Sequence, residues 1–178
     1  EQTFDTFDTR KKLTPDERRN LELALEIAIS YARRPQDWLV LLGPYGSGKT
    51  HLAAAIAHYQ QQQGTDVMFI TVPDLLDYLR LAFNPSAPVS FDHRFQLVRN
   101  AAFLVLDDLG TENSSAWAKE KLFQIMDYRY VARLPTVITT AKRLEDLDGR
   151  IRSRLIDERR CTTVAITAPG YPLRLKRD

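Results

Sequence analysis

The sequence contains little cysteine and histidine and no long apolar run. Cys161 is the only cysteine among 178 residues, so an internal disulfide is excluded and a reducing compartment is expected. No apolar run reaches the ~18 residues of a membrane span, so we expect a cytoplasmic protein without a membrane partner. The three histidines lack the spacing of metal ligands, which argues against a zinc site. The net charge of +2 gives no general reason to expect a polyanionic partner.

Short apolar runs instead alternate with segments of helical periodicity. Strands are predicted at residues 38–42, 66–72, 102–110, 135–141 and 161–166. Helices are predicted at residues 13–34, 50–64, 73–83, 91–100, 114–132 and 144–158, the first of them beginning with a Thr14/Glu17 capping box. This alternation is typical of an α/β domain whose parallel sheet is covered on both faces. Functional residues are then expected at the carboxyl ends of the strands.

The stretch GPYGSGKT, residues 43–50, fits the phosphate-binding P-loop pattern and lies between a predicted strand and a predicted helix. Glycines let the backbone wrap a phosphate chain, and exposed amides face the anion. Lys49 is predicted to reach the outer phosphates and Thr50 to coordinate Mg²⁺. The expected ATP/ADP-binding residues are Gly43, Pro44, Tyr45, Gly46, Ser47, Gly48, Lys49, Thr50 and His51.

Two carboxylates lie at the end of the third predicted strand, in the sequence LVLDDLG. Asp107 is the expected partner of Thr50 at the metal, and Asp108 is the expected group that orients the attacking water. Many related ATPases carry glutamate at the second position. Because aspartate is shorter by one methylene, slow turnover is expected. Glu112 is the alternative residue for that role.

These motifs, together with VPDLLDYLR, LPTVITT and RIRSRL, resemble the AAA+ ATPases of the bacterial helicase-loader family (DnaC/DnaI-like) and the related IstB-like transposition helpers. The resemblance covers nearly the whole chain. It implies an AAA+ P-loop core with a five-stranded parallel sheet in the order 5-1-4-3-2, without a C-terminal lid domain. We expect a single domain over residues 1–178, with an N-terminal segment (1–13), a core (14–168) and a tail (169–178). A partner-binding domain preceding residue 1 in a longer chain is a further hypothesis.

The resemblance also assigns roles to single residues. Arg154 in RIRSRL matches the arginine finger, which acts in trans on the nucleotide of a neighbouring subunit, so a homo-oligomer is implied. The alternative for Arg154 is a surface ion pair with Asp157 or Glu158. Thr140 matches the polar sensor near the γ-phosphate. Since the family often has asparagine where this chain has Ala141, Thr139 or Thr140 is left to serve that role.

Loader-type proteins bind single-stranded DNA, and the segment 73–99 interleaves arginines with aromatic residues as such a site requires. Arg80 and Arg94 are the predicted DNA contacts, whereas Phe83 and Phe95 are expected in the core. Phe4 and Phe7 are predicted either to cover the adenine or to pin a free chain end.

The function implied is a weak ATPase that acts in DNA replication as a helicase-loader-like adaptor, with a replicative helicase and single-stranded DNA as partners. The alternative is an IstB-like ATPase helper of transposition, which the ATPase core alone does not distinguish from a loader. A small-molecule kinase lacks support, because neither an acceptor pocket nor an arginine-rich lid is evident. A nucleotide-binding scaffold that scarcely hydrolyses ATP also remains open, since Asp108 and Ala141 depart from the family pattern.

Overall fold

A computed structural model describes residues 2–10, 12–111 and 115–170. Its five strands are β1 (Trp38–Leu42), β2 (Val67–Thr71), β3 (Phe103–Asp107), β4 (Thr136–Thr140) and β5 (Cys161–Ala165). The α-helices are α1 (Pro15–Arg33), α2 (Lys49–Gln62), α3 (Val72–Arg80), α4 (Phe91–Asn100), α5 (Ala116–Val131) and α6 (Gly149–Leu155). Two 3₁₀ turns, η1 (Leu81–Phe83) and η2 (Leu144–Asp146), complete the elements.

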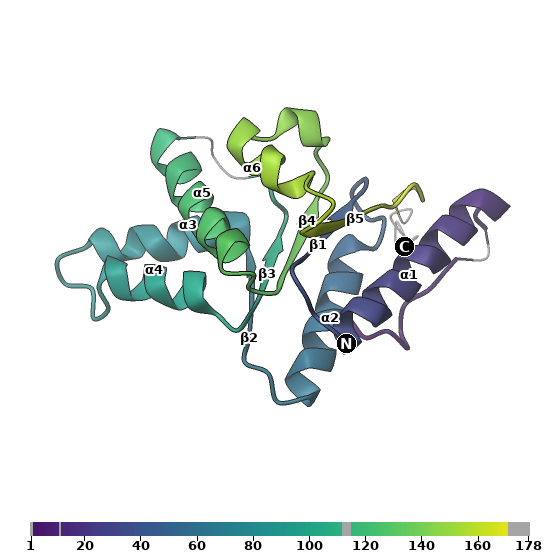
Figure 1. The fold of residues 1–178 in the computed structure, drawn as a ribbon, viewed down its shortest axis with the longest axis horizontal. Coiled ribbons are helices and arrows are strands. Elements are labelled where there is room, and N and C mark those ends of the chain that lie inside the picture. Colours follow the sequence, from purple (N-terminus) through teal and green to yellow (C-terminus); the bar gives the residue numbers. More distant parts are fainter. Residues whose placement is uncertain (1, 11, 112–114, 171–178) are drawn as a thin grey trace, which may run out of the picture.

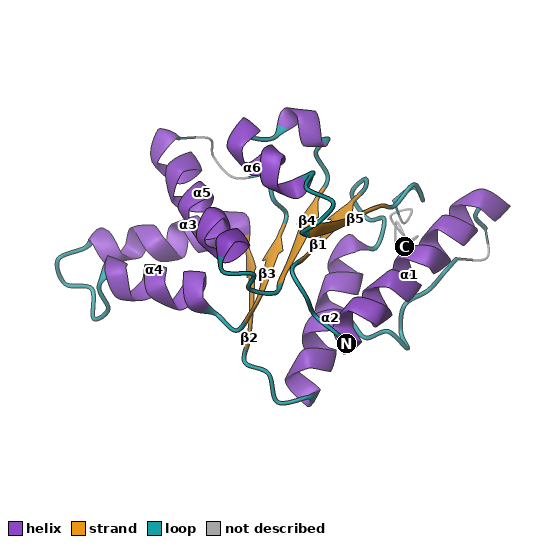
Figure 2. Ribbon diagram, viewed as in Figure 1, coloured by secondary structure: helices purple, strands orange, loops and turns teal. Residues whose placement is uncertain are grey.

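The strands form one parallel sheet in the order β2-β3-β4-β1-β5 (Figure 2), which confirms the predicted order. Helices α1 and α2 pack on one face, where Leu52 and Ile56 of α2 belong to the same buried cluster as Leu39 and Leu41 of β1. Helices α3 to α6 cover the other face (Figure 1). Because both faces are covered, every residue of the central strands β3 and β4 is buried.

Helix α1 begins where the sequence predicts it. The Thr14 hydroxyl accepts a hydrogen bond from the Glu17 amide at 3.3 Å, and the Glu17 carboxylate accepts one from the Thr14 amide at 2.9 Å. This reciprocal pair satisfies two amides that the first helical turn leaves without partners. The capping box is confirmed.

Two predicted helices are shorter in the structure than in the sequence analysis. The segment 73–83 ends its α-helix at Arg80 and continues as the turn η1. The segment 144–158 is split, because the Asp148 carboxylate accepts hydrogen bonds from the amides of Arg150 and Ile151 and so starts a new helix at Gly149. A local capping bond thus overrides the continuous helical pattern.

Two aromatic predictions for the core have different outcomes. Phe95 is buried, as predicted, whereas the side chain of Phe83 is 58% exposed, so its assignment to the core is wrong. Phe83 stacks on Phe91 instead, with ring centroids 5.4 Å apart, at the end of the α3–α4 excursion from the sheet. The Cys161 thiol is buried as expected, and burial raises its pKa to about 12.

A fully buried arginine joins the amino edges of the central strands. Arg129 donates to the carbonyl oxygens of Arg99, Ala101 and Pro135 at 2.7–3.1 Å and to the Thr136 hydroxyl at 2.9 Å. Burial lowers the pKa of its guanidinium to about 10. One side chain therefore links the segment that leads into β3 to the segment that leads into β4. Within the described residues, no helix has both the length and the apolar character needed to cross a membrane.

We predict that Arg129→Met lowers the free energy of unfolding by about 3–5 kcal/mol, because four buried or partly buried acceptors lose their donor at once. Urea denaturation followed by circular dichroism measures the change. Arg152→Met, at an exposed position on α6, is the matched control and should change stability by less than about 0.5 kcal/mol. Equal stability of the two variants would contradict the structural role of Arg129.

Candidate nucleotide-binding site

The P-loop follows β1 and opens directly into α2, at the carboxyl edge of the sheet. Gly43, Gly46 and Gly48 have φ angles of 154°, 71° and 109°, in a region that disfavours other residues. A Cβ atom on Gly43 would lie 2.7 Å from the Ile166 carbonyl oxygen, so this position also requires glycine for space. The sequence pattern GPYGSGKT is thus set by backbone geometry as well as by chemistry.

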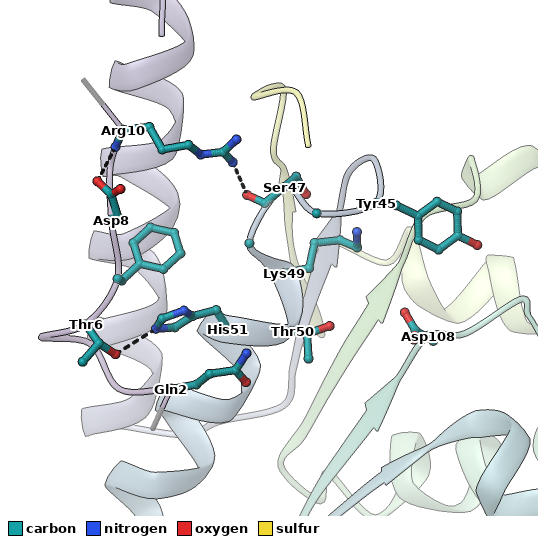
Figure 3. A pocket seen from close by; sticks show the side chains of 13 residues that line it. Gln2, Thr6, Asp8, Arg10, Tyr45, Ser47, Lys49, Thr50, His51 and Asp108 are labelled. Carbon is teal, nitrogen blue, oxygen red and sulfur yellow. Dashed lines mark hydrogen bonds between the residues drawn. The ribbon is translucent and has the colours of Figure 1, made fainter. Parts of the chain in front are cut away.

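A cavity of about 370 Å³ lies beside this loop (Figure 3). Of the predicted nucleotide-binding residues, the cavity is lined by Tyr45, Gly46, Ser47, Gly48, Lys49, Thr50 and His51. Gly43 and Pro44 form the turn before it, and the Pro44 carbonyl oxygen accepts a hydrogen bond from Lys49 Nζ at 2.8 Å. The Lys49 side chain is almost fully buried, and burial lowers the pKa of its ammonium group against the opposing influence of Asp108 and Asp107.

The metal-side residues meet as predicted. The Thr50 hydroxyl lies 3.0 and 3.1 Å from the two carboxylate oxygens of Asp107, which is itself only 3% exposed. A hydroxyl and a carboxylate side by side provide the hard oxygen ligands that Mg²⁺ prefers, with water completing its shell. Among the described residues, the Ser47 hydroxyl of the P-loop is buried without a hydrogen-bond partner. The Thr50 and Asp107 oxygens fit a Mg²⁺ ion that also binds phosphate. Among the described residues, no group of three or more His, Cys, Asp or Glu side chains could hold a metal ion by itself.

Thr139, rather than Thr140, is the β4 threonine whose hydroxyl contacts Asp107. Its hydroxyl donates to Asp107 at 2.6 Å and accepts from the Asp108 amide at 3.0 Å. The Thr140 hydroxyl turns to the Leu109 carbonyl oxygen at 2.7 Å instead. The strand register explains the difference, because Leu106 pairs with Ile138 and the next residues, Asp107 and Thr139, are therefore neighbours.

Asp108 lines the cavity with its backbone in the left-handed region at φ 57° (Figure 3). Burial raises the pKa of its carboxyl group first, the nearby Asp107 adds to the rise, and Lys49 opposes it. A carboxylate with a raised pKa at the mouth of a phosphate cradle is suited to accept a proton from water. Glu112, the alternative for this role, lies outside the described residues.

Arg154 lies elsewhere, on α6, and does not line this cavity. Its Nε and Nη2 atoms donate to one carboxylate oxygen of Asp127 at 3.0 and 2.7 Å. The ion pair predicted as the alternative is therefore present, but with Asp127 on α5 in place of Asp157 or Glu158. Arg150, on the same side, pairs with Glu120 at 2.9 Å, and both guanidinium groups lie within about 5 Å of the Phe123 ring.

The two predicted DNA contacts also have partners within the chain. Arg80 forms an ion pair with Asp77 at 3.1 Å and lies over the Trp117 ring. Arg94 donates to the Tyr78 carbonyl oxygen at 2.7 Å and stacks on the same tyrosine's ring at 4.6 Å. The aromatic and basic side chains of this segment are thus brought together, and Arg80 keeps a partly exposed face.

The N-terminal segment contributes more to the cavity than the sequence analysis foresaw. Phe4 and Phe7 both pack against the core, and Phe7 also lines the cavity, so covering of the adenine stays a prediction. The residues that the sequence analysis missed are Gln2, Thr6, Asp8 and Arg10. His51 joins this segment to α2, since its Nε2 atom lies 2.8 Å from the Thr3 carbonyl oxygen and its ring meets Phe7 edge-to-face. These contacts span more than 40 residues, and no local pattern signals them.

The family follows from a comparison with known proteins. The model of the IstB-like ATP-binding proteins matches residues 1–164. This chain belongs to that family. The replicative helicase loader DnaC of Escherichia coli (strain K12) is 31% identical over 121 residues, which are 68% of this chain and 49% of DnaC. The putative ATP-binding protein of insertion sequence IS5376 from Geobacillus stearothermophilus is 31% identical over 140 residues, or 79% of this chain and 53% of that protein.

Solved structures agree with this placement. A crystal structure of the DnaC helicase loader superposes with a TM-score of 0.76 at 25% identity, covering 93% of this chain and 96% of that one. The replication initiator DnaA, bound to AMPPCP and single-stranded DNA, also gives a TM-score of 0.76, but at 16% identity it supports the fold alone. The protein is therefore a DnaC/IstB-like AAA+ protein, as the resemblance predicted. This IstB-like chain spans about half the length of the curated relatives it matches.

We predict that Asp108→Asn raises the melting temperature at pH 7 by about 1–2 °C. A carboxyl group whose pKa is raised on folding contributes stability below its ordinary pKa of 3.8 and loses that contribution as the pH rises through the folded-state pKa. The increase in melting temperature of Asp108→Asn over the wild type should therefore vanish near pH 4 and be complete at neutral pH. Asparagine tolerates the left-handed backbone as aspartate does.

Thermal unfolding followed by circular dichroism from pH 4 to 8 measures this gain. Asp66→Asn, at an exposed position before β2, is the control and should leave the melting temperature unchanged. A melting temperature of Asp108→Asn at or below that of the wild type at pH 7 would refute the expected cost of ionising Asp108.

Proposed function

We propose that this protein binds ATP with Mg²⁺, hydrolyses it slowly, and acts in DNA replication as a helicase-loader-like adaptor that binds single-stranded DNA. The observation that carries the proposal is the contact of Thr50 and Thr139 with the buried Asp107 beneath the P-loop. Hydroxyl and carboxylate groups that are hydrogen-bonded to one another at the carboxyl ends of β3 and β4 are what a nucleoside triphosphate site of this fold needs. Similarity to DnaC supports the adaptor role.

The chain's own residues divide the chemistry between them. The amides of the P-loop and the Lys49 ammonium, released from the Pro44 carbonyl oxygen, neutralise the outer phosphates. Thr50 and Asp107 would hold Mg²⁺, which would stabilise the negative charge of the phosphate chain. Asp108 orients and deprotonates the attacking water. We assign the polar-sensor role to Thr139 rather than Thr140, because the Thr139 hydroxyl is the one that touches Asp107.

Arg154 would complete the site of a neighbouring subunit in a homo-oligomer. Its side chain is 30% exposed, it does not line the cavity of its own chain, and the described contacts hold it on Asp127. A half-exposed ion pair of this kind is worth only ~0–1 kcal/mol, so a phosphate can displace the carboxylate. The guanidinium group would then stabilise the negative charge that develops in the transition state.

Single-stranded DNA would bind along the α3–α4 excursion. The exposed ring of Phe83 provides a stacking surface for a base, and the half-exposed Arg80 lies beside Trp117 within reach of a backbone phosphate. Arg94, which is hydrogen-bonded to Tyr78 and stacked on its ring, would hold this surface in shape and add positive charge to it. This arrangement revises the predicted role of Phe83 from core residue to contact residue.

The second candidate function is an ATPase helper of DNA transposition. The family model that matches the chain is that of IstB-like proteins, and the insertion-sequence relative aligns over more of this chain than DnaC does. Affinity measurements with purified full-length protein distinguish the two roles. Binding to the replicative helicase hexamer supports the loader, and binding to the transposase of an IstB-type insertion sequence supports the helper.

Steady-state ATP hydrolysis tests the proposal directly. The rate per subunit should rise with protein concentration and again with single-stranded DNA, because the composite site forms only between subunits. Lys49→Ala is the blank, since it removes the charge at the outer phosphates. A rate at the level of the blank at every concentration would leave a nucleotide-binding scaffold and refute the ATPase.

We predict that Arg154→Ala lowers the rate at high protein concentration by at least about 10-fold and leaves the affinity for ADP unchanged. Arg152→Ala, two residues away on the same helix and exposed, should hydrolyse ATP as the wild type does. Equal rates for the two variants across the concentration series would rule out action of Arg154 in trans.

A further inference from the structure

The guanidinium group of Arg10 joins three segments that are distant in sequence. Its Nη2 atom donates to the Ser47 carbonyl oxygen of the P-loop at 3.0 Å, and its Nη1 atom donates to the carbonyl oxygen of Pro169 beyond β5. The Arg10 amide is itself held by the Asp8 carboxylate at 2.8 Å, and the Arg10 backbone has a φ of 55°. Figure 3 shows the side chain reaching across from α1's side of the cavity to Ser47.

The contact with Ser47 determines how one P-loop peptide is oriented. In a planar trans peptide the carbonyl oxygen and the following amide hydrogen point in opposite directions. With the Ser47 oxygen bound to Arg10, the Gly48 amide points away from Arg10, and Lys49 and Thr50 lie on that other side of the loop in Figure 3. An amide turned inward is what a P-loop uses to bind phosphate oxygen.

The neighbouring Phe7 holds the same peptide from the same side. A Cβ atom on Gly48 would lie 3.0 Å from the Phe7 ring, so the ring packs directly on this glycine. Gly48 has a φ of 109°, which leaves its flanking peptides without the steric limits that other residues impose. A peptide at so permissive a position needs an external restraint, and Arg10 and Phe7 provide it.

We infer that Arg10 is a positioning residue for phosphate binding: it acts through the Ser47–Gly48 peptide and is itself braced by Pro169. This inference rests on the proposed binding of nucleotide at the P-loop. Lysine in place of arginine keeps the charge but cannot hold two carbonyl oxygens in a fixed fork. The role should therefore depend on the guanidinium geometry as well as on its charge.

The test is calorimetric titration of the full chain with Mg-ADP and with adenosine, for the wild type, Arg10→Lys and Arg10→Gln. We expect both variants to bind Mg-ADP about 5- to 10-fold more weakly, the loss of one charged hydrogen bond, and to bind adenosine within 2-fold of the wild type. Arg152→Lys is the matched control and should change neither affinity. Titrations are made at least 20 °C below the melting temperature of each variant, as measured by circular dichroism, so that a stability loss does not enter the affinity.

Two results would overturn the inference. Wild-type affinity of Arg10→Lys for Mg-ADP would mean that charge alone matters, and an equal loss for adenosine and Mg-ADP would mean that Arg10 serves the base pocket. A wild type that binds no Mg-ADP at all would instead refute the proposed function, so the two failures are distinguishable.

Discussion

The buried carboxylate of Asp107 is the point on which the rest of the site depends. It ends β3, the third strand, and accepts hydrogen bonds from Thr50 at the start of α2 and from Thr139 on β4. A carboxylate that is 3% exposed is costly unless its oxygens are paired. The hydroxyls of Thr50 on α2 and Thr139 on β4 pair with these oxygens. The need to pair one buried carboxylate therefore fixes the positions of β3, α2 and β4 relative to one another.

The same constraint governs the chain just after β3. The Asp108 amide donates to the Thr139 hydroxyl, the Leu109 amide to the Thr139 carbonyl oxygen at 2.9 Å, and the Leu109 carbonyl oxygen accepts from Thr140. These hydrogen bonds to β4 hold the turn after β3 in place. They also fix the Asp108 backbone in the left-handed conformation beside the cavity. Thr139 binds the Asp107 carboxylate, and Thr140 binds the turn at the Leu109 carbonyl oxygen. A carboxylate so fixed faces the phosphate cradle without reorganising.

Sequence patterns predicted the parts of this arrangement that depend on local chemistry. The five strands follow from apolar runs, and the P-loop follows from glycine spacing, because a permissive backbone and a phosphate-facing amide both need those residues. The resemblance matched Thr140 to the polar sensor, but strand register decides which hydroxyl meets Asp107, and the sequence does not reveal that register. The partner of Arg154 was sought among nearby acids, whereas Asp127 lies 27 residues earlier on α5. Arg10 reaches partners 37 and 159 residues away, which no periodicity reveals.

Three arginines in this chain show how the partner of a charge decides what the charge can do. Arg129 is fully buried and donates only to groups of the chain that hold β3 and β4 in place, so its role is confined to the fold. Arg10 also binds carbonyl oxygens, but one of them belongs to Ser47 of the P-loop, and for this reason we infer a role for Arg10 in phosphate binding. Arg154 is bound by a carboxylate at a half-exposed surface. A carboxylate and a phosphate both offer oxygen acceptors to a guanidinium group, so Asp127 holds Arg154 with the same type of contact that, in the oligomer we propose, a neighbouring subunit's nucleotide would make.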